Sequence, residues 1–291
     1  MAELRGVCTP VCTIFSEDGS VVDDTALRNH LDTLIEAGVP IVTTCGGTGE
    51  FSFLRAEERR QVTEVTARHI EGQAQLIVHA SAVMTEEAIE YAKHAESLGA
   101  DALLLLPPYF EGPNMQGVYE HYARVAEAVS TPIMAYNIPV HSGIYLDPDF
   151  YARLCSEIDT VRYLKDSTGD FLALQEFLRR GAKVFVGCDP LMYHGVLAGA
   201  AGCFWGTANA IPAQAVKLYE LAAAGELQAA NALWQVLYPV NQFVWSHPFN
   251  PSVKAAGRIL GHDLRECRRP AQPLTNDELA ALREALQPLL A

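Results

Sequence analysis

The chain of 291 residues lacks an excess of basic side chains and has no Lys/Arg-rich run. Its 35 Asp and Glu residues outnumber its 21 Lys and Arg residues, which gives a formal net charge of −14. Such a chain is repelled by a phosphate backbone and by anionic lipid. Nucleic acid and membrane surfaces are therefore not expected as partners.

Long hydrophobic runs are absent as well. No uninterrupted apolar stretch approaches the roughly 20 residues that a membrane-spanning helix needs, although 49% of the residues are hydrophobic and can fill a large core. The opening MAELRGVCTPVCTIF shows no basic segment followed by an apolar one, as a secretion signal would. We therefore expect a cytoplasmic protein.

Patterns for disulfides, metal ions and nucleotides are missing. Seven cysteines are an odd number, and the CTPVC segment at residues 8–12 is spaced too widely for a CxxC pair, so we expect reduced thiols. There is no HxH pair, no HExxH helix, no P-loop and no GxGxxG turn. We expect neither a metal nor an organic cofactor.

What is present is a regular alternation of two kinds of segment. Eight short apolar or β-branched runs recur, with amphipathic segments of helical spacing between them. Strands that are continuously apolar, each followed by a helix, form parallel sheets covered by helices. Eight such units in about 210 residues predict a (β/α)8 TIM barrel. The eight runs are residues 6–15, 41–47, 75–81, 101–108, 132–139, 161–167, 183–189 and 202–209.

The chain after about Glu226 shows helical patterns but no strand pattern. We predict two parts, a barrel catalytic domain of residues 1–225 and a C-terminal helical extension of residues 226–291 that packs on it. The extension includes the aromatic segment WQVLYPVNQFVW, which is expected to pack against the barrel or a neighbouring subunit. Helices are expected at 24–38, 56–72, 85–100, 226–245, 250–261 and 275–290.

Lys165 stands at the end of the sixth run, in VRYLKDSTGD (residues 161–170). Active sites of these barrels lie at the carboxyl ends of the strands. If Val161 and Tyr163 face the barrel interior, alternation places Lys165 there too and turns Asp166 to the other face. Burial disfavours the ammonium and leaves an amine free to attack a carbonyl, as Schiff-base catalysis requires. The alternative is a structural ion pair with a neighbouring aspartate.

Two further motifs fit such chemistry. Tyr136 ends the neighbouring fifth run, where a phenol can shuttle protons to and from an imine-forming lysine. The glycine-rich CGGTGEF follows the second run, and the backbone around Gly47 with the Thr48 hydroxyl can bind a carboxylate. A 2-oxo acid needs its carboxylate held while its ketone meets the amine. The alternative for CGGTGEF is a tight strand-to-helix turn capped by Glu50.

GGTGE, YNIP and YLKDSTGD occur in this order on the second, fifth and sixth runs, and with them the chain resembles the dihydrodipicolinate synthase and N-acetylneuraminate lyase family. The resemblance covers most of the chain, including NPSVKAAGRILG in the extension. It implies class I Schiff-base chemistry on a pyruvate-type 2-oxo acid, and tetramers built from dimers that meet near Tyr109. The site residues implied are Lys165 as the Schiff-base lysine, Tyr136 as the proton shuttle, Gly47 and Thr48 as the carboxylate clamp, and Gly187 and Phe204 as further pocket residues.

Three positions depart from the dihydrodipicolinate synthase pattern, which usually has Thr, Tyr and Arg in place of Gly47, Phe110 and His141. Arg is the preferred bidentate partner of a carboxylate, so its loss argues against aspartate semialdehyde as the substrate. GGTGEF with LLLLPPY resembles 5-dehydro-4-deoxyglucarate dehydratases, whereas YNIPVHSG is closer to neuraminate lyases and sugar-acid aldolases. His141 is expected to contact the variable end of the substrate, or it is a surface loop residue.

The sequence thus predicts a lyase that forms an imine with a 2-oxo acid. Aldol cleavage releasing pyruvate, loss of water and deamination all start from this imine. We favour a 2-keto-3-deoxy sugar acid aldolase or dehydratase. The first alternative is 4-hydroxy-tetrahydrodipicolinate synthase, which condenses pyruvate with aspartate semialdehyde, and an alternative of another class is a non-catalytic 2-oxo acid binding protein.

Overall fold

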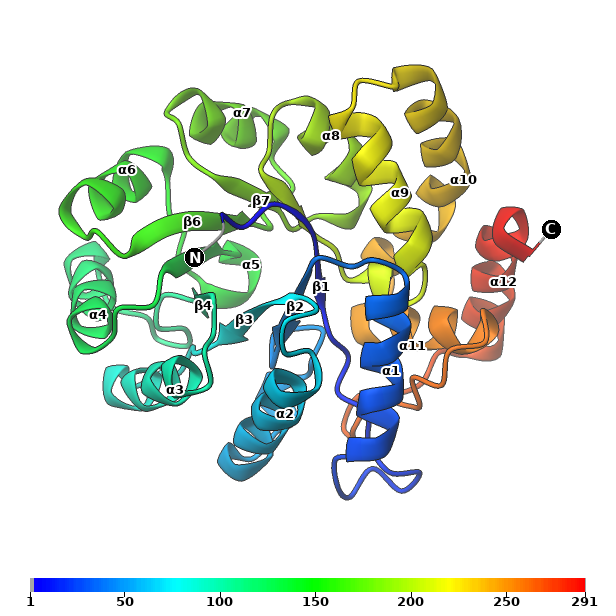
Figure 1. Ribbon diagram of the computed structural model, residues 1–291, viewed down its shortest axis with the longest axis horizontal. Coiled ribbons are helices and arrows are strands. Elements are labelled where there is room, and N and C mark those ends of the chain that lie inside the picture. The colour runs from blue at the N-terminus through cyan, green and yellow to red at the C-terminus, as the bar shows by residue number, and fades with distance from the viewer. Residues whose placement is uncertain (1–2, 291) are drawn as a thin grey trace.

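The computed structural model describes residues 3–290, and its eight strands form a closed parallel barrel, as predicted (Figure 1). The strands pair in chain order and the last one closes the barrel on the first. Each strand begins inside one of the eight apolar runs. The strands are β1 (Gly6–Pro10), β2 (Ile41–Thr44), β3 (Gln75–His79), β4 (Ala102–Leu105), β5 (Ile133–Asn137), β6 (Val161–Asp166), β7 (Val184–Val186) and β8 (Gly202–Phe204).

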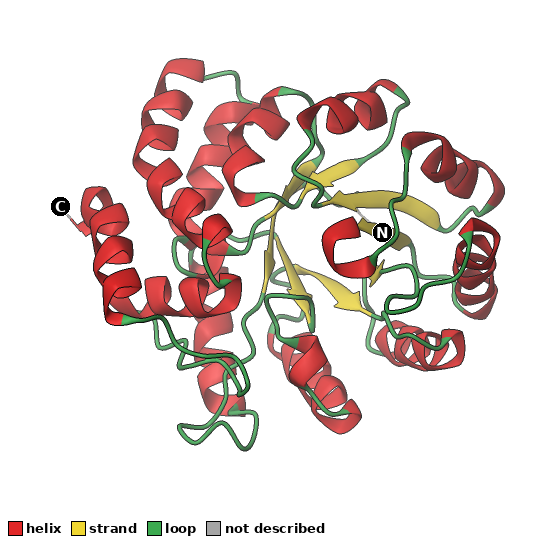
Figure 2. Cartoon of the chain, turned by 180° about the vertical axis from the view of Figure 1, so that it is seen from behind, coloured by secondary structure: helices red, strands yellow, loops and turns green. Residues whose placement is uncertain are grey.

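Helices surround the central strands in Figures 1 and 2. Three of the helices are preceded by an aspartate that caps them. The carboxylates of Asp23, Asp147 and Asp170 each accept at least one hydrogen bond from the free N–H groups of the first turn. The helices of the barrel are α1 (Asp24–Glu36), α2 (Ala56–His69), α3 (Thr85–Ser97), α4 (Met115–Ala128), α5 (Pro139–Ser142), α6 (Pro148–Glu157), α7 (Phe171–Arg179), α8 (Met192–Leu197) and α9 (Pro212–Ala223).

Two clusters of buried apolar side chains hold the barrel together. One fills the barrel interior and the other lies between the strands and the surrounding helices. Tyr163 belongs to the interior cluster, as predicted, but Val161 belongs to the outer one. The condition that Val161 faces the interior is therefore not met, because Arg162 is skipped in the pairing of β5 with β6 and the alternation is interrupted before Tyr163.

The extension consists of α10 (Leu227–Ser246), α11 (Phe249–Ile259) and α12 (Asn276–Leu290), close to the predicted helices. It lies on the side of the barrel that carries α1 and α9 (Figures 1 and 2). Trp234 of α10 is buried against Tyr193 and Trp205 of the barrel, which confirms that the aromatic segment packs there. The division at residue 225 stays a prediction, and its outer bounds, residues 1 and 291, lie outside the described residues.

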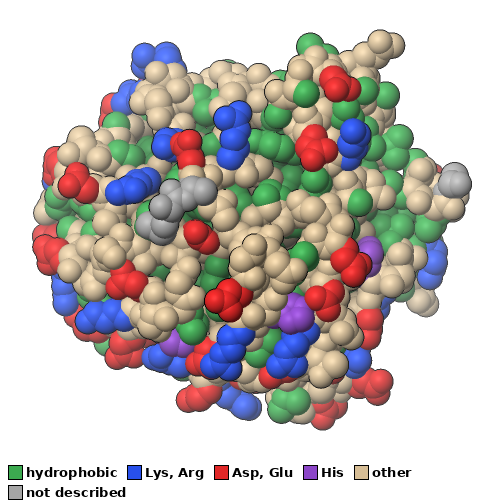
Figure 3. All heavy atoms as spheres, in the orientation of Figure 1, with side chains coloured by type: hydrophobic (Ala, Val, Ile, Leu, Met, Phe, Trp, Pro, Cys, Tyr) green, Lys and Arg blue, Asp and Glu red, His purple; other side chains and the backbone are tan. Residues whose placement is uncertain are grey.

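The surface turned to the viewer in Figure 3 carries acidic and basic side chains side by side, without a continuous basic patch. Among residues 3–290, no helix is both long and apolar enough to cross a membrane.

Candidate active site

Lys165 and Tyr136 lie side by side at the carboxyl ends of β6 and β5. They are register partners in the sheet, and the Lys165 Nζ lies 3.9 Å from the centroid of the Tyr136 ring. The ring of Phe204, at the end of β8, lies at the same distance of 3.9 Å from Nζ. Lys165 is 5% exposed and Tyr136 is 7% exposed. The barrel therefore holds a buried amine between two aromatic rings.

The aspartates next to Lys165 in the sequence are engaged elsewhere. Asp166 points to the other face of β6, as predicted, and accepts hydrogen bonds from Asn137 Nδ2 (3.0 Å) and Thr168 Oγ1 (2.9 Å). Burial raises the pKa of the Asp166 carboxyl to about 6. Asp170 caps α7. The alternative of a structural ion pair between Lys165 and a neighbouring aspartate is therefore wrong.

Gly187 leaves the space that the lysine side chain needs. A Cβ atom at this position would lie 2.1 Å from the Ser167 Oγ, 3.2 Å from the Lys165 Cε and 3.2 Å from the Asp166 carbonyl oxygen. Contacts this short force the neighbouring groups to move. A glycine after β7 thus lets Lys165 extend along the barrel interior.

The turn after β2 exposes backbone donors. Glu50 adopts the left-handed conformation (φ 56°), and a Cβ at Gly49 would lie 3.0 Å from the Val11 carbonyl oxygen, so only glycine fits there without strain. Among the described residues, no acceptor is found for the backbone N–H of Gly47 or of Thr48. These two N–H groups are therefore free to bind an anion.

A cavity of about 610 Å³ opens at this end of the barrel. It joins residues from the ends of β2, β5, β6, β7 and β8, and all seven residues singled out in the sequence line it. These are Gly47, Thr48, Tyr136, His141, Lys165, Gly187 and Phe204. The chemical roles assigned to them remain predictions.

The extension contributes a wall of the cavity that the sequence analysis missed. The turn from α10 to α11 places Trp245, His247, Phe249 and Asn250 along it. A Cβ at Gly206, after β8, would lie 2.5 Å from the Phe249 Cζ, so this glycine lets the ring approach the barrel. The NPSVKAAGRILG segment was part of the family resemblance, but nothing in its pattern says that it reaches the strand ends.

The extension also contacts the turn after β2 that contains Gly47 and Thr48. Asn250 Nδ2 donates a hydrogen bond to the Gly47 carbonyl oxygen (2.9 Å), 203 residues away in the chain. Glu50 precedes a short 3-10 helix (Phe51–Phe53), but its side chain makes no capping hydrogen bond and instead forms an ion pair with Lys254 of α11 (2.7 Å), with both side chains fully buried. The Lys254 Nζ also donates to the Thr13 carbonyl oxygen (2.7 Å), and Glu50 accepts from the Arg268 N–H (3.0 Å). Because each charge has several partners, the buried pair is compensated.

Asp189 contributes a carboxyl group to the cavity wall. It is buried, and it accepts hydrogen bonds from the Thr207 N–H (2.8 Å) and the Thr207 Oγ1 (2.5 Å). Burial raises the pKa of Asp189 to about 6, and the bonds to Thr207 and the charge of Lys165 offset part of the rise. Above this pH the carboxylate adds a negative charge to the cavity.

The cysteines are free thiols, as predicted. Burial raises the pKa of Cys8 and of Cys12 to about 12, so both stay protonated and unreactive near neutral pH. Within residues 3–290, no group of three or more His, Cys, Asp or Glu side chains is arranged to hold a metal ion.

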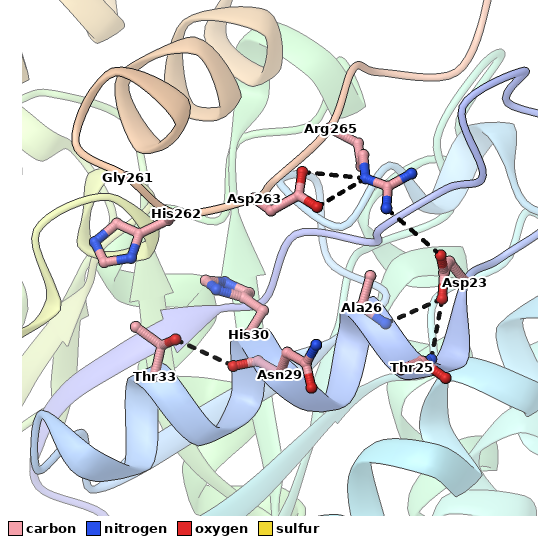
Figure 4. Close-up of a pocket in the computed structure, with 10 residues that line it drawn as sticks. All are labelled: Asp23, Thr25, Ala26, Asn29, His30, Thr33, Gly261, His262, Asp263 and Arg265. Atoms are coloured by element: carbon pink, nitrogen blue, oxygen red, sulfur yellow. Dashed lines mark hydrogen bonds and ion pairs between the residues drawn. The ribbon is translucent and has the colours of Figure 1, made fainter.

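A second cavity of about 210 Å³ lies between α1 and the loop that follows α11 (Figure 4). Arg265 contacts Asp263 and Asp23 there, and Asp23 also caps α1. His30 lines the same cavity, and its Nε2 bonds to the Asn209 Oδ1 (2.8 Å). None of the seven predicted site residues lines it, so the candidate chemistry belongs to the cavity at the strand ends.

A buried lysine on β6 of a (β/α)8 barrel, next to a phenol and a free backbone anion site, defines a class of proteins: lyases that form a Schiff base between the lysine and a 2-oxo acid. A model of the "Dihydrodipicolinate synthetase family" matches residues 3–289. The chain belongs to this family, as its motifs predicted, and is an enzyme of the class I lyase type.

Individual relatives match along nearly their whole length. The chain is 32% identical over 290 residues to a 4-hydroxy-tetrahydrodipicolinate synthase of Methanopyrus kandleri, which covers 99% of this chain and 97% of the relative. It is 33% identical over 288 residues to an uncharacterized DapA-like lyase of Halobacterium salinarum, which covers 98% of this chain and 94% of the relative.

Solved structures of the same family align with nearly the whole chain. The family member YagE from E. coli K12, solved in complex with pyruvate, aligns with a TM-score of 0.94 at 28% identity and covers 99% of both chains. A putative dihydrodipicolinate synthetase from Pseudomonas aeruginosa aligns with the same TM-score of 0.94 at 31% identity, covering 99% of this chain and 100% of that one. The names of the relatives agree better with the synthase alternative than with the sugar acid lyase favoured from the sequence.

Proposed function

We propose that Lys165 forms an imine with the ketone of a 2-oxo acid and that the cavity at the strand ends carries out lyase chemistry on this imine. The observation that carries the proposal is the position of the amine. It is buried against Tyr136 and Phe204, is not paired with its neighbouring aspartates, and shares a cavity with the free N–H groups of Gly47 and Thr48.

The geometry supports the following sequence of steps. The substrate carboxylate binds the N–H groups of Gly47 and Thr48, which directs the ketone toward Lys165. The amine attacks the carbonyl carbon, and the carbinolamine loses water to give a protonated imine. When the bond between C3 and C4 of a 4-hydroxy-2-oxo acid breaks, the imine takes up the electron pair and an aldehyde leaves.

Tyr136 handles the protons in these steps. Its phenol gives its proton to the hydroxyl that leaves the carbinolamine as water, accepts the proton of the C4 hydroxyl as the bond breaks, and returns that proton to C3 of the enamine. Water then hydrolyses the imine, which releases pyruvate and restores the Lys165 amine. Run in the opposite direction, the same steps condense pyruvate with an aldehyde.

Borohydride trapping tests the proposal against the alternative of a non-catalytic binder. A reduced pyruvyl adduct is expected on Lys165 when the protein is incubated with pyruvate and borohydride and its peptides are analysed by mass spectrometry. Lys165→Met is expected to lose the adduct. Lys183→Met, which removes a half-exposed lysine paired with Glu3, is expected to keep it. A wild-type protein without an adduct would refute the enzyme mechanism.

Two finer functions each have an observation in their favour. The names of the relatives favour 4-hydroxy-tetrahydrodipicolinate synthase, which uses aspartate semialdehyde as the second substrate. His141 at the cavity, where such synthases usually have Arg, favours a 2-keto-3-deoxy sugar acid aldolase or dehydratase. A panel of 2-oxo acids and aldehydes, assayed for pyruvate release, dehydration and pyruvate consumption, separates them.

We also propose a homotetramer built from dimers, in a cytoplasmic location. Phe110 is 79% exposed with a left-handed backbone (φ 58°), and Tyr109 beside it packs edge-on against Phe51, so an aromatic turn is presented at the surface. Seven free thiols suit a reducing compartment. Light scattering after size exclusion is expected to give the mass of four chains, and a monomer would contradict the assembly.

A further inference from the structure

We propose that the wall supplied by the extension, formed by Trp245, His247 and Phe249, binds an uncharged part of the substrate that carries hydroxyl groups and an apolar face. The 2-oxo acid would then have a single carboxylate, the one held by Gly47 and Thr48. This inference rests on the proposed function and adds the substrate class.

The size of the cavity shows that pyruvate alone does not fill it. Its volume of about 610 Å³ falls within the range of about 300–1,000 Å³ typical of sites for larger organic ligands. Lys165 is 5% exposed and lies at its base, whereas Trp245 is 39% exposed and Val140 is 79% exposed. The substrate beyond the reacting ketone therefore extends toward Trp245 and Val140.

The outer wall is largely apolar. The rings of Trp245 and Phe249 meet edge to face, with centroids 6.4 Å apart, and Ile138 and Val140 line the cavity with them. Aromatic and aliphatic side chains bind the C–H face of a sugar chain or ring without a charge partner.

The charges in the cavity disfavour a second carboxylate. Lys165 is the one Lys or Arg side chain among the described residues that line it, and imine formation occupies this group. Asp189 brings a negative charge near neutral pH, because its pKa is about 6. A distal carboxylate would lose part of its hydration and meet no guanidinium and no second ammonium among these lining side chains, which is unfavourable.

The polar groups of the wall suit hydroxyl groups. The ring of His247 stacks on Phe243, with centroids 3.8 Å apart, and its Nδ1 lies 2.9 Å from the Phe243 carbonyl oxygen. Because a carbonyl only accepts, Nδ1 carries a proton and donates it, which leaves Nε2 as the ring nitrogen of His247 that is available to a ligand. Ser167, which is 4% exposed and lines the cavity beside Lys165, has an Oγ without a partner in the structure. Substrate hydroxyl groups suit both sites, because a hydroxyl can donate a hydrogen bond as well as accept one.

A pair of aldehydes that differ in one group tests the proposal. Glyceraldehyde and tartronate semialdehyde have the same carbon chain, but the first ends in CH2OH and the second in a carboxylate. Condensation with pyruvate is followed by pyruvate consumption, after borohydride trapping has shown the imine on Lys165. We expect kcat/KM for glyceraldehyde to exceed that for tartronate semialdehyde by at least tenfold. Equal values, or a preference for the anionic aldehyde, would overturn the inference.

Variants of the wall separate this inference from the mechanism. Trp245→Ala is expected to lower kcat/KM for glyceraldehyde at least tenfold while the rate of pyruvate imine trapping stays unchanged. His247→Arg is expected to shift the preference toward tartronate semialdehyde. Leu227→Ala, at the exposed start of α10, is the control and should change neither value. If no imine is trapped at all, the proposed function fails and this inference fails with it; if the imine forms without the preference, only this inference fails.

Discussion

In the proposed mechanism, the hydroxyl of Tyr136 donates and accepts protons. The ring of Tyr136 has a separate role, because it packs against the Lys165 amine. Tyr136→Phe keeps the ring and removes the hydroxyl. We expect turnover to fall by about 10²–10⁴-fold, the usual contribution of a general acid and base, while borohydride still traps the imine. Tyr163→Phe, whose hydroxyl accepts from the Leu4 N–H in the same barrel interior, should keep its turnover. Equal turnover of Tyr136→Phe and wild type would refute the assigned role.

Gly187 offers a steric test of the lysine position. Gly187→Ala adds a Cβ that overlaps the Ser167 Oγ at 2.1 Å and crowds the Lys165 Cε at 3.2 Å. We expect imine trapping to slow at least tenfold, since the amine is displaced. The double variant Ser167→Ala/Gly187→Ala removes the worst overlap and should recover part of the rate. If the single variant Gly187→Ala is trapped at the wild-type rate, glycine at this position is not needed to place the Lys165 amine.

At the scale of elements, α11 and the turn after β2 share a buried ion pair. Lys254→Met leaves the Glu50 carboxylate buried without its ammonium, which typically costs about 3–5 kcal/mol. The double variant Lys254→Met/Glu50→Gln removes both charges and is expected to cost less. Urea unfolding measures the difference, and equal losses in both variants would mean that the carboxylate is compensated by other groups.

The regular elements could be predicted because their patterns are local. Parallel strands covered by helices are continuously apolar, so all eight appear in the sequence. The run at residues 6–15 is longer than β1, because buried loop residues continue its apolar pattern. The position of Lys165 and Tyr136 at the cavity could be predicted because the active sites of such barrels lie at the carboxyl ends of the strands. The outward direction of Val161 could not be predicted, because the sequence does not show that Arg162 is skipped in the pairing of β5 with β6.

The wall from the extension could not be predicted for a different reason. Trp245 and Phe249 follow the pattern of an ordinary amphipathic helix, and the contact of Asn250 with Gly47 joins positions 203 residues apart. A single sequence contains no periodicity that reports such contacts. Only the three-dimensional packing of α10 and α11 on the barrel reveals them.

The stability of the whole molecule should depend on pH through its buried carboxyl groups. The pKa of Asp189 is about 6 in the folded protein, against about 3.9 for a free aspartate. The folded protein therefore binds the proton more tightly, and its stability falls as pH rises from about 4 to about 6, with the loss remaining above pH 6.

The variant Asp189→Asn removes this titration. Its stability relative to wild type is expected to rise between pH 4 and pH 6 and then to level off, with a gain of at most about 3 kcal/mol. Melting temperatures measured across this range provide the check. Asp159→Asn, at an exposed aspartate, serves as the control. A relative stability of Asp189→Asn that is the same at pH 4 and pH 7 would contradict the raised pKa.

Because the chain is synthesised from its N-terminus, the ion pair between Glu50 and Lys254 can form only late in synthesis. The last barrel strand ends at Phe204, but the bonds of Gly47 and Glu50 to Asn250, Lys254 and Arg268 need residues 250–268. Until then, the Glu50 carboxylate lacks the Lys254 ammonium and the Gly47 carbonyl lacks its hydrogen bond from Asn250. A chain that stops before residue 250 would therefore contain Lys165 and every barrel strand but lack the contacts that join the turn of Gly47 and Thr48 to α11.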